Sequence, residues 1–586
     1  MCGIFGYIGK NNQAGDLILK GLKSLEYRGY DSWGVAIKNN DGTLFVEKHI
    51  GKIGDATFPS IESHIGIGHT RWATHGKVTD ANSHPHLSCD NKIAVVHNGI
   101  VENFEELKRE LIKKGHTFKS DTDSEVIAHL LEESLKETKD LRTAFYQLQT
   151  RIKGMNAVIA FFPEEELFYI VKNGSPIVIG KGSEEFFIAS DASAIIPYTK
   201  HVYFVEDDEM LKISTAGIEL FDTNGKAKPI KYSTLNYTSE AVDLGEYKHF
   251  MMKEIHEQPQ IIRSIAATQS AGIKEAATKI KKSFGTYLVG CGTASYACLA
   301  GTYLFSKIAK RHVNFSISSE FSYLLDFLKD TSLVIALSQS GETIDTISSV
   351  KKAIEQKVHL LTITNVENST LHRMAKSSLI LGAGPEKAVA STKAYTAKIA
   401  MLYLIAHELN DTRAEGLKNI EKAAIGIASI LKRKQEMRAL AQSISTASHI
   451  FVLGRGVSYA TALEAALKIK EVSYIHAEGF AAGELKHGVI ALIEKRTPVI
   501  IFNPEDETYE DTLSAAHEVK ARGAYVIGIS SKNSPVYDVY VEVENCEDAT
   551  IIPNVVIAQL LGYYLALEKG YDPDMPRNLA KSVTVK

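Results

Sequence analysis

The chain has 586 residues, 45% of them hydrophobic and 23% charged, so about three to five domains of ordinary size are expected. This composition excludes a disordered, a collagen-like and a small disulfide-scaffold protein. The formal net charge of −4 provides no basic surface for nucleic acid, and no apolar run near the ~20 residues of a membrane span stands out. We therefore expect neither a nucleic-acid nor a membrane partner.

The cysteines and the amino-terminal segment indicate the compartment. Cys2, Cys89, Cys291, Cys298 and Cys546 form no CxxC pair. An odd number of cysteines in a long chain favours a reducing compartment over a disulfide framework or a zinc ribbon. The first residues, MCGIFGYIGKNN, lack the charged segment and long apolar stretch of a signal peptide. We expect a cytoplasmic protein.

Residues 2–225 are expected to form an α+β domain with much antiparallel sheet. Short apolar segments such as CGIFGYIG, KIAVVHNGI and EFFIASD are typical of strands. The segments NFEELKRELIKKG and SEVIAHLLEESLKE have the i, i+3, i+4 spacing of amphipathic helices. Residues 226–245 are polar and lack a sustained period, and are therefore expected to be a linker.

From residue 246 onward, long helices alternate with compact apolar strands, as in parallel sheets with crossover helices. The pattern occurs twice: GCGTASYA aligns with GRGVSYA, LSQSGET with FNPEDET, and LLTITN with YVIGIS, at a nearly constant offset. This repeat predicts two doubly wound α/β domains, over 246–430 and 431–575, followed by a tail over 576–586.

Cys2 is the first candidate for chemistry. Aminopeptidases remove a first Met that precedes a small residue, which would leave a thiol and a free α-amine on Cys2. Because an α-amine has a pKa of roughly 7.7–8.0, it can accept the thiol proton near working pH. Cys2 would then be both nucleophile and base. For Cys2 considered alone, a buried cysteine beside the start is the simpler interpretation.

Other polar residues follow predicted strands in the same domain. Asn98 and Gly99, in HNGIVEN, can direct an amide and a backbone N–H at one oxygen, as an oxyanion hole requires. Arg71 would pair with a carboxylate and Asp123 with an ammonium group, which suits a free amino acid. Structural alternatives remain: Asn-Gly is usually a turn, and Asp before a helix is usually an N-cap. HTRWATH is also compatible with a polar-edged strand.

In the second part of the chain, LSQSGET follows a strand and opens a helix. Its hydroxyls, amide and N–H groups suit a phosphate cradle, and the absence of a lysine argues against a Walker nucleotide site. The alternative is a serine-rich helix cap. The second copy has Glu505 and Asp506 at this place, which would repel phosphate, so one phosphate site per chain is expected. Thr293 lies at a first strand–helix turn, where ligands gather in parallel sheets.

Ionisable residues are dense toward the carboxyl terminus. Lys468 and Glu471 share one helical face because they are three residues apart. Glu471 could move a proton between adjacent carbons, and His487 could open a sugar ring. A solvated charged face is the alternative. Lys581 would form a Schiff base with a ketose in a closed pocket, and would otherwise be an exposed charge.

These segments resemble known families. CGIFG, LEYRGYDS, HTRWATHG, HPH, HNGIVEN and TDSEVI resemble the N-terminal-nucleophile glutaminase domain of class II amidotransferases. LSQSGET, VASTKAY, AAGELKHG and PRNLAKSVTV resemble paired sugar-isomerase (SIS) domains. The whole chain resembles the glutamine–fructose-6-phosphate aminotransferase (isomerizing) family. The implied fold is a glutaminase sandwich followed by two doubly wound sugar-isomerase domains.

The resemblance implies the reaction of D-fructose 6-phosphate with L-glutamine to give D-glucosamine 6-phosphate and L-glutamate, the first step toward UDP-N-acetylglucosamine. It makes Cys2 the nucleophile, Asn98 and Gly99 the oxyanion hole, and Trp72 a channel gate. The residues implied around glutamine are Arg71, Thr74, His75, His84 and Asp123. No metal and no organic cofactor are implied, because imine chemistry uses a protein lysine and no metal-ligand spacing stands out.

In the sugar site, the resemblance makes Lys581 the imine-forming residue, Glu471 the proton shuttle and Lys468 its assistant. His487 would come from a neighbouring subunit, which implies a homodimer. The residues implied at the sugar phosphate are Thr293, Ser338, Gln339, Ser340, Thr343, Val389 and Ser391. The chain departs from the family pattern at Trp33, where a smaller residue is common, and at Ala294, where many members have Ser.

Two other functions are compatible with part of this pattern. One is a related enzyme that uses another sugar phosphate or acts as a deaminase or deglycase, and an intact glutaminase half argues against it. The other is a sugar-phosphate-sensing module without catalysis, and retention of Cys2, Glu471, His487 and Lys581 argues against it. Glutamate release from glutamine, with and without fructose 6-phosphate, discriminates among the three.

Overall fold

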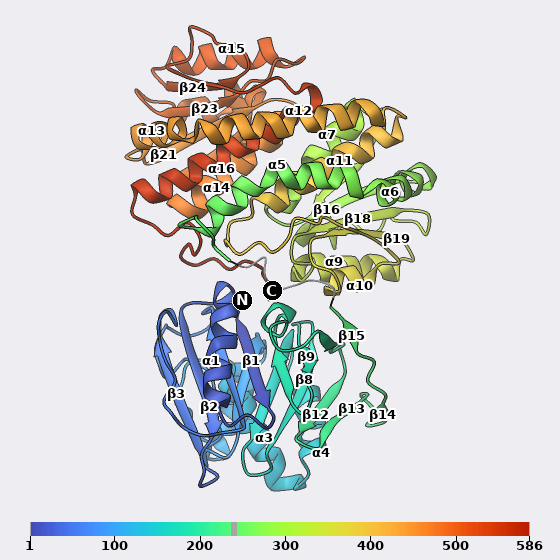
Figure 1. The fold of residues 1–586 in the computed structure, drawn as a ribbon, viewed down its shortest axis with the longest axis vertical. Coiled ribbons are helices and arrows are strands. Elements are labelled where there is room, and N and C mark those ends of the chain that lie inside the picture. Colours follow the sequence, from blue (N-terminus) through green and yellow to red (C-terminus); the bar gives the residue numbers. More distant parts are fainter. Residues whose placement is uncertain (1, 236–242, 585–586) are drawn as a thin grey trace. The chain divides into compact units, whose positions relative to one another are not determined.

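The structure is a computed structural model that describes residues 2–235 and 243–584. It divides into two units: Met1–Ala241 together with Ala580–Lys586, and Val242–Leu579 (Figure 1).

The first unit contains two antiparallel sheets. The eight-stranded sheet has the order β15-β11-β9-β10-β1-β4-β2-β3. Its strands are β1 (Gly3–Ile8), β2 (Ser32–Lys38), β3 (Leu44–Ile50), β4 (Ile65–Arg71), β9 (Val178–Lys181), β10 (Phe186–Ala189), β11 (His201–Phe204) and β15 (Ser233–Thr234). The seven-stranded sheet has the order β14-β13-β12-β8-β7-β6-β5. Its strands are β5 (His86–Leu87), β6 (Ala94–Gly99), β7 (Asn156–Phe162), β8 (Leu167–Asn173), β12 (Met210–Ser214), β13 (Gly217–Phe221) and β14 (Ala227–Lys228).

Helices pack on the outer face of each sheet. Helix α1 (Ala14–Leu25) packs on the first sheet, and α2 (Phe104–Lys113), α3 (Glu125–Thr138) and α4 (Leu141–Arg151) pack on the second. Because side chains alternate along a strand, Ile4 and Ile8 enter the core shared by the sheets, whereas Phe5 and Tyr7 pack under α1. The predicted glutaminase sandwich is confirmed, and its strand ends carry the candidate residues.

Part of the expected linker belongs to these sheets. Strand β14 pairs with β13, and β15 pairs with β11. Two-residue strands are too short to show an alternating pattern in the sequence, which is why this segment seemed irregular. Residues 236–242 of the expected linker lie outside the described residues.

The second unit contains two five-stranded parallel sheets, with the orders β17-β16-β18-β19-β20 and β22-β21-β23-β24-β25. The first sheet consists of β16 (Thr286–Gly290), β17 (Asn314–Ile317), β18 (Leu333–Ser338), β19 (His359–Thr364) and β20 (Ser377–Ile380). The second consists of β21 (His449–Gly454), β22 (His476–Ala481), β23 (Pro498–Phe502), β24 (Tyr525–Ser530) and β25 (Val539–Glu542). Since the two orders are equivalent strand by strand, the predicted repeat is confirmed.

The helices of this unit follow the same alternation. They are α5 (Phe250–Thr268), α6 (Ser270–Lys282), α7 (Thr293–Lys307), α8 (Ser318–Phe321), α9 (Ile344–Glu355), α10 (Thr370–Met374), α11 (Lys393–Leu409), α12 (Arg413–Lys432), α13 (Lys434–Ile444), α14 (Val457–Ser473), α15 (Tyr509–Lys520) and α16 (Ile551–Glu568). The first turns of the copies correspond. Gly292 and Gly456 precede α7 and α14 with φ of 52° and 56°, a conformation that favours glycine.

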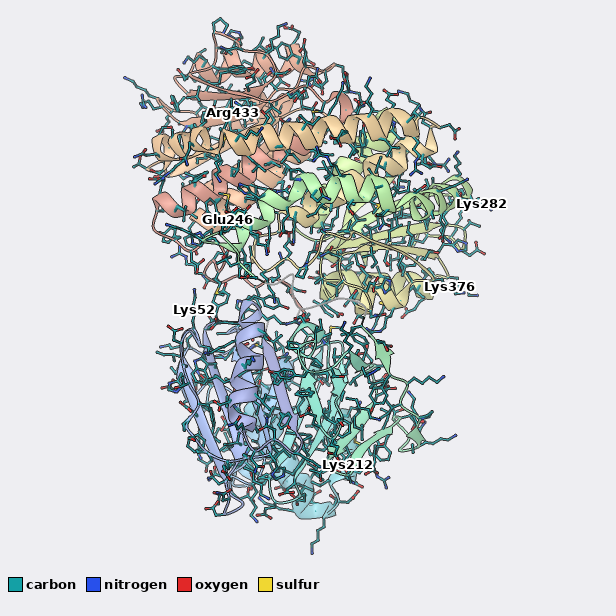
Figure 2. All side chains as sticks on the ribbon, viewed as in Figure 1. Lys52, Lys212, Glu246, Lys282, Lys376 and Arg433 are labelled. Atoms are coloured by element: carbon teal, nitrogen blue, oxygen red, sulfur yellow. The ribbon has the colours of Figure 1, made fainter. Side chains whose placement is uncertain are left out.

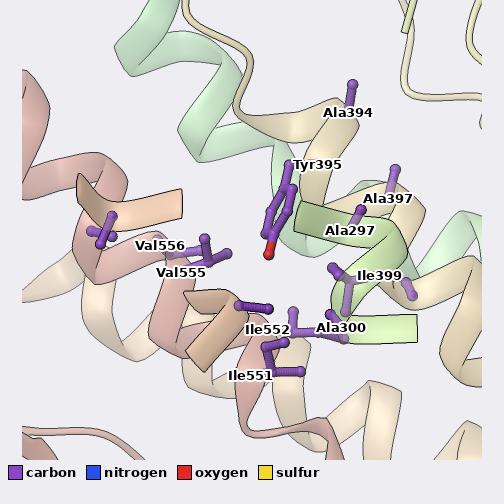
Figure 3. Close-up of a cluster of buried hydrophobic side chains, with 14 of the residues drawn as sticks. Ala297, Ala300, Ala394, Tyr395, Ala397, Ile399, Ile551, Ile552, Val555 and Val556 are labelled. Carbon is purple, nitrogen blue, oxygen red and sulfur yellow. The ribbon is translucent and has the colours of Figure 1, made fainter. Parts of the chain in front are cut away.

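The core of the second unit joins helices of both copies. Tyr395 of α11 lies among Ala297 and Ala300 of α7 and Ile552 and Val555 of α16 (Figure 3). Small side chains on α7 leave room for the aromatic ring. In contrast to this core, charged residues such as Lys52, Lys282 and Lys376 are exposed on the surface of the units (Figure 2).

The sequence analysis missed one apolar helix. Among the described residues, Glu547–Glu568 is long and apolar enough to span a membrane, with a mean hydropathy of 1.6, and 94% of that window is buried inside the unit. The interspersed Asn554 and Gln559, both buried, had hidden the run. Its burial within the unit is that of a core helix.

Candidate active sites

The first candidate site is centred on Cys2, immediately before β1. Its thiol accepts a hydrogen bond from the Trp72 N–H at 3.3 Å and lies 3.6 Å from the Trp72 carbonyl oxygen. Asn98, near the end of β6 in the other sheet, donates from Nδ2 to the Cys2 carbonyl oxygen at 3.1 Å. The sandwich therefore brings the predicted nucleophile and the predicted oxyanion amide together.

The Cys2 thiol needs a base. Burial raises the pKa of the Cys2 thiol, although the Trp72 N–H and the Arg71 guanidinium act in the opposite direction. A thiol with a raised pKa is protonated at neutral pH, whereas the thiolate is the nucleophile. The site therefore suits a mechanism in which a neighbouring base removes the thiol proton.

His69 fixes the orientation of Asn98, and sequence reasoning missed it. His69 Nε2 lies 3.1 Å from Asn98 Oδ1 and 3.2 Å from the His97 carbonyl oxygen. Burial lowers the pKa of His69 to about 3, so the ring is neutral and Nε2 carries the proton that these oxygens accept. With Oδ1 held by His69, Asn98 Nδ2 faces Cys2. The position of His69 in HTRWATHG, two residues before Arg71, was the available signal.

Gly99 follows Asn98 in a conformation that other residues avoid. Its φ is 145°, and a Cβ at this position would lie 2.2 Å from the Met155 carbonyl oxygen. The backbone can approach this closely only at glycine. The turn therefore requires glycine at position 99.

Arg71 and Asp123 are both buried and both bond to backbone. The Arg71 guanidinium donates to the carbonyl oxygens of His75 at 2.5 Å and Lys77 at 3.2 Å. Asp123 accepts from the Val101 N–H at 2.7 Å. Arg71 therefore shapes the loop after β4, and Asp123 joins the start of α3 to the segment after β6.

The remaining predicted glutamine residues lie around this loop. Thr74 is exposed and sits 3.4 Å from His75 Nδ1. His84 is buried, stacks on His69 at 4.1 Å between ring centroids, and accepts the His97 N–H at 3.3 Å. Burial lowers the pKa of His84 well below its ordinary value, which keeps Nδ1 an acceptor.

The Trp33 side chain lies on the face of the sheet that packs under α1. It lies on β2 in the core under α1, where its ring packs on His49 at 4.6 Å between centroids. The side chain therefore belongs to the outer face of the sheet.

The second candidate site is centred on Lys468, which is fully buried on α14. Its Nζ donates to Glu471 Oε2 at 2.5 Å and to Thr293 Oγ1 at 3.1 Å. Thr293 begins α7 in the first copy, whereas Lys468 and Glu471 belong to the second. The repeat therefore forms this site from both of its copies.

Glu464 completes the cluster, and sequence reasoning missed it. Its Oε1 lies 3.4 Å from Lys468 Nζ and accepts the Thr293 hydroxyl at 3.3 Å. Burial raises the pKa of Glu464 to about 7, opposed by Lys468. Burial lowers the pKa of Lys468, but Glu464 and Glu471 outweigh burial and raise it above the ordinary value. The i, i+4 spacing of Glu464 and Lys468 is the sequence feature from which this contact could have been predicted.

The predicted phosphate segment forms a turn between β18 and α9. Ser338 Oγ accepts the Gly341 N–H at 3.0 Å and lies 3.2 Å from Thr343 Oγ1, and Ser340 Oγ accepts the Glu342 N–H at 3.1 Å. Gly341 has a φ of 68°. The turn gathers hydroxyls at the start of a helix, an arrangement that suits an anion.

The other predicted sugar-site residues, Gln339, Val389 and Ser391, form hydrogen bonds within the second unit. The Gln339 carbonyl oxygen accepts the Asn365 N–H at 3.1 Å. The Val389 N–H donates to the Asp574 carbonyl oxygen at 2.9 Å, and the Ser391 hydroxyl donates to Glu386 at 3.0 Å.

Ser295, His487 and Lys581 complete the residues considered for the sugar site. The Ser295 hydroxyl donates to the Gly292 carbonyl oxygen at 2.7 Å, so it is turned back to its own helix and does not replace a hydroxyl at Ala294. His487 is exposed at the end of the turn Ala482–His487, and in the described parts of the chain it has no hydrogen bond or ion pair. Lys581 belongs to the first unit, so its pairing with a sugar stays a prediction.

Comparisons with known proteins agree with this organisation. A glutamine amidotransferase domain model matches residues 69–197, and an SIS domain model matches residues 279–408 and 443–560. In the second unit, the chain is similar to the C-terminal domain of glucosamine-fructose-6-phosphate aminotransferase from Francisella tularensis, with 34% sequence identity and a TM-score of 0.54. The match covers 57% of this chain and 100% of that chain. Fold and sites define a glutamine amidotransferase joined to paired sugar-isomerase domains.

Full-length relatives specify the family. The chain is 43% identical over 600 residues to the glutamine–fructose-6-phosphate aminotransferase (isomerizing) of Pyrococcus horikoshii, with 100% of both chains covered. It is 39% identical over 611 residues to the protein of the same name from Thermus thermophilus, again with 100% of both covered. The chain belongs to the glutamine–fructose-6-phosphate aminotransferase (isomerizing) family.

Proposed function

We propose that the chain converts D-fructose 6-phosphate and L-glutamine to D-glucosamine 6-phosphate and L-glutamate. The observation that carries the proposal is that one chain combines a thiol site, Cys2 with Asn98, and a buried acid–base site, Lys468 with Glu471. Family membership over the full length supports the same reaction. The product would enter amino-sugar synthesis.

In the glutamine half-reaction, the Cys2 thiol would attack the side-chain amide carbon. With Met1 removed, the α-amine of Cys2 would take the thiol proton and pass it to the departing ammonia. Asn98 Nδ2 and the Gly99 N–H would stabilise the oxyanion that forms. Water would then hydrolyse the thioester to release L-glutamate. Arg71 would hold the glutamine carboxylate and Asp123 its ammonium group, within a pocket that includes Thr74, His75 and His84.

In the sugar half-reaction, the hydroxyls of the turn 338–343 and of Thr293 would hold the phosphate. His487 of a second copy would help open the sugar ring, and Lys581 would form an imine with the ketose carbonyl at C2. Ammonia would displace the lysine from C2. Glu471, which accepts a hydrogen bond from Lys468, would then take a proton from C1 and deliver it to C2.

Two further features belong to the proposal. Ammonia must not escape or be protonated on its way, so an enclosed passage is required, and we assign its gate to Trp72. Because His487 would come from another copy, the smallest active assembly would be a homodimer. The enzyme would act in the cytoplasm.

The decisive experiment follows the nitrogen. The full chain is incubated with amide-¹⁵N glutamine and fructose 6-phosphate, and the products are analysed by mass spectrometry. The proposal expects ¹⁵N in an aminohexose phosphate and an equal amount of glutamate. A related enzyme for another sugar would label a different product, and a binding module would release no glutamate. Either of those results would overturn the assignment.

A further inference from the structure

Four side chains with metal-binding atoms converge in the first unit, and none of them is used in the proposed reaction. Cys89 lies between β5 and β6, His116 lies between α2 and α3, and His129 and Glu132 lie on α3. One ligand atom from each residue lies within 4.8 Å of all the others. His129 and Glu132 are three residues apart on one helix, but Cys89 and His116 are distant from them in the chain, so the sequence analysis predicted no metal there.

Four of the six separations between these ligand atoms match those of a tetrahedral metal site. Cys89 Sγ lies 3.6 Å from His116 Nδ1 and 3.5 Å from His129 Nδ1. Glu132 Oε2 lies 3.3 Å from His116 Nδ1 and 3.5 Å from His129 Nδ1. Around tetrahedral zinc, with Zn–S of about 2.3 Å and Zn–N and Zn–O of about 2.0 Å, neighbouring ligands lie about 3.3 to 3.6 Å apart. These four separations therefore suit a zinc ion, and the other two pairs of ligand atoms lie within 4.8 Å of each other.

Glu133 orients the His116 ring by a hydrogen bond, and Glu125 faces the His129 ring at ion-pair distance. His116 Nε2 lies 3.1 Å from Glu133 Oε2, and His129 Nε2 lies 3.5 Å from Glu125 Oε1. When Nε2 carries the ring proton and faces a carboxylate, Nδ1 presents a lone pair. Metal-binding histidines in proteins are usually held in this way.

Proton counting also favours a cation. With both Nε2 atoms protonated, the two Nδ1 atoms are acceptors, and the Cys89 thiol has a single proton to offer them, while Glu132 Oε2 accepts the Cys89 N–H at 2.9 Å. Three of the side chains, those of His116, His129 and Glu132, are buried. Acceptors that face each other in a buried place are unfavourable unless a cation lies between them.

We propose that Cys89, His116, His129 and Glu132 bind a zinc ion. A thiolate with two imidazoles and a carboxylate suits zinc rather than calcium or magnesium, which prefer oxygen ligands alone. Four protein ligands leave no open position for a substrate, so the site is structural. Cys89, which is exposed, is the side from which the ion would enter.

The ion would hold α3 to the segment between β5 and β6 and to the loop after α2. Glu125, which orients His129, also accepts the N–H groups of Lys119 and Ser120 at 2.7 Å each. The same turn leads directly into Asp123, which we assign to the ammonium group of glutamine. Zinc would therefore stiffen the segment that presents Asp123.

Metal content and a spectrum test the proposal independently of turnover. The full chain is expressed with zinc, purified without chelator, and analysed for metal, and a stoichiometric amount of zinc is expected. After exchange, Co²⁺ should give the thiolate-to-cobalt charge-transfer band and the intense d–d bands of a tetrahedral site. The variant Cys89→Ser should lose the charge-transfer band, and Glu133→Gln should weaken zinc binding by about 10–100-fold.

Matched variants make the result specific. Cys291→Ser changes a half-buried cysteine of the second unit, and His64→Gln changes a histidine that contacts Glu166 in the first unit. Both should leave zinc binding and the cobalt spectrum unchanged. If the purified chain holds no zinc and gives no cobalt band, or if zinc binding is the same in Cys89→Ser, the proposal is wrong. Since Cys89 is exposed, its variant is informative even if a buried histidine variant fails to fold.

Discussion

We predict that Glu464 makes the stability of the second unit depend on pH. It is fully buried beside Lys468, and in the described parts of the chain its Oε2 has no hydrogen-bond partner. We predict that Glu464→Gln removes this dependence. Glutamine has the shape of the protonated acid, its Oε1 can still accept the Thr293 hydroxyl, and Lys468 keeps Glu471 as a partner.

The magnitude follows from the pKa of Glu464. Burial raises the pKa from 4.5 to about 7. Because the folded state has the higher pKa, the contribution of the protonated carboxyl is complete below pH 4.5 and is lost as the pH rises through about 7. At about 1.4 kcal/mol per pKa unit, ionisation costs the folded state roughly 1 kcal/mol at pH 5 and about 3 kcal/mol at pH 8. The variant should therefore gain about 2 kcal/mol on its parent between these pH values.

Hydrogen–deuterium exchange of peptides from α14 is the suitable assay. Both tryptophans, Trp33 and Trp72, lie in the first unit, so tryptophan fluorescence does not follow the second. Comparing the variant with its parent at one pH cancels the intrinsic pH dependence of exchange. The protection of α14 amides in Glu464→Gln relative to the parent should rise on the order of 30-fold between pH 5 and pH 8.

A control on an exposed carboxylate separates this effect from general charge. Glu355, in the last turn of α9, is exposed, and Glu355→Gln should keep the pH dependence of the parent. If Glu464→Gln and its parent change protection equally between pH 5 and pH 8, the carboxyl is not protonated in the fold, and the reasoning from burial is refuted.

Three substitutions test the proposed reaction. Cys2→Ala should abolish glutamate release yet leave sugar-phosphate isomerisation, and continued release would reject Cys2 as nucleophile. Asn98→Ala should lower kcat for glutamine hydrolysis by about 10²–10³-fold with little change in KM, and an unchanged kcat would remove Asn98 from the oxyanion hole. Lys581→Ala should keep glutaminase activity and lose glucosamine 6-phosphate formation, so full synthesis by this variant would contradict the imine.

Features that depend on a few neighbouring residues were predictable from the sequence. The two parallel sheets followed from apolar strands that alternate with helices, and the duplication from glycines such as Gly292 and Gly456, whose φ near 55° is required by the turn. Lys468 and Glu471 followed from their helical spacing. In each case the chain itself places the residues together, so no knowledge of the tertiary fold is needed.

Features that need the tertiary fold were missed. Cys89, His116 and His129 come together only because the segment after β5, the loop after α2 and helix α3 meet on one side of a sheet. Glu464 has the appearance of an ordinary charged residue, and its raised pKa depends on burial between helices of two copies. The chemistry of both clusters depends on burial, and burial cannot be predicted from the neighbouring residues in the sequence.

The two copies of the repeat differ at the positions to which we assign the sugar chemistry. In the first copy, the turn after β18 carries hydroxyls, whereas Asp506 at the same place in the second copy accepts the Thr508 N–H at 2.8 Å and caps its own turn. The second copy instead provides Lys468 and Glu471 on α14, and the first provides Thr293 beside them. If the two copies were identical, the turn after the third strand would carry the same side chains, either hydroxyls or carboxylates, in both copies. In the proposed reaction, this divergence would let the first copy hold the phosphate while the second moves protons, so we expect a single sugar-phosphate site per chain.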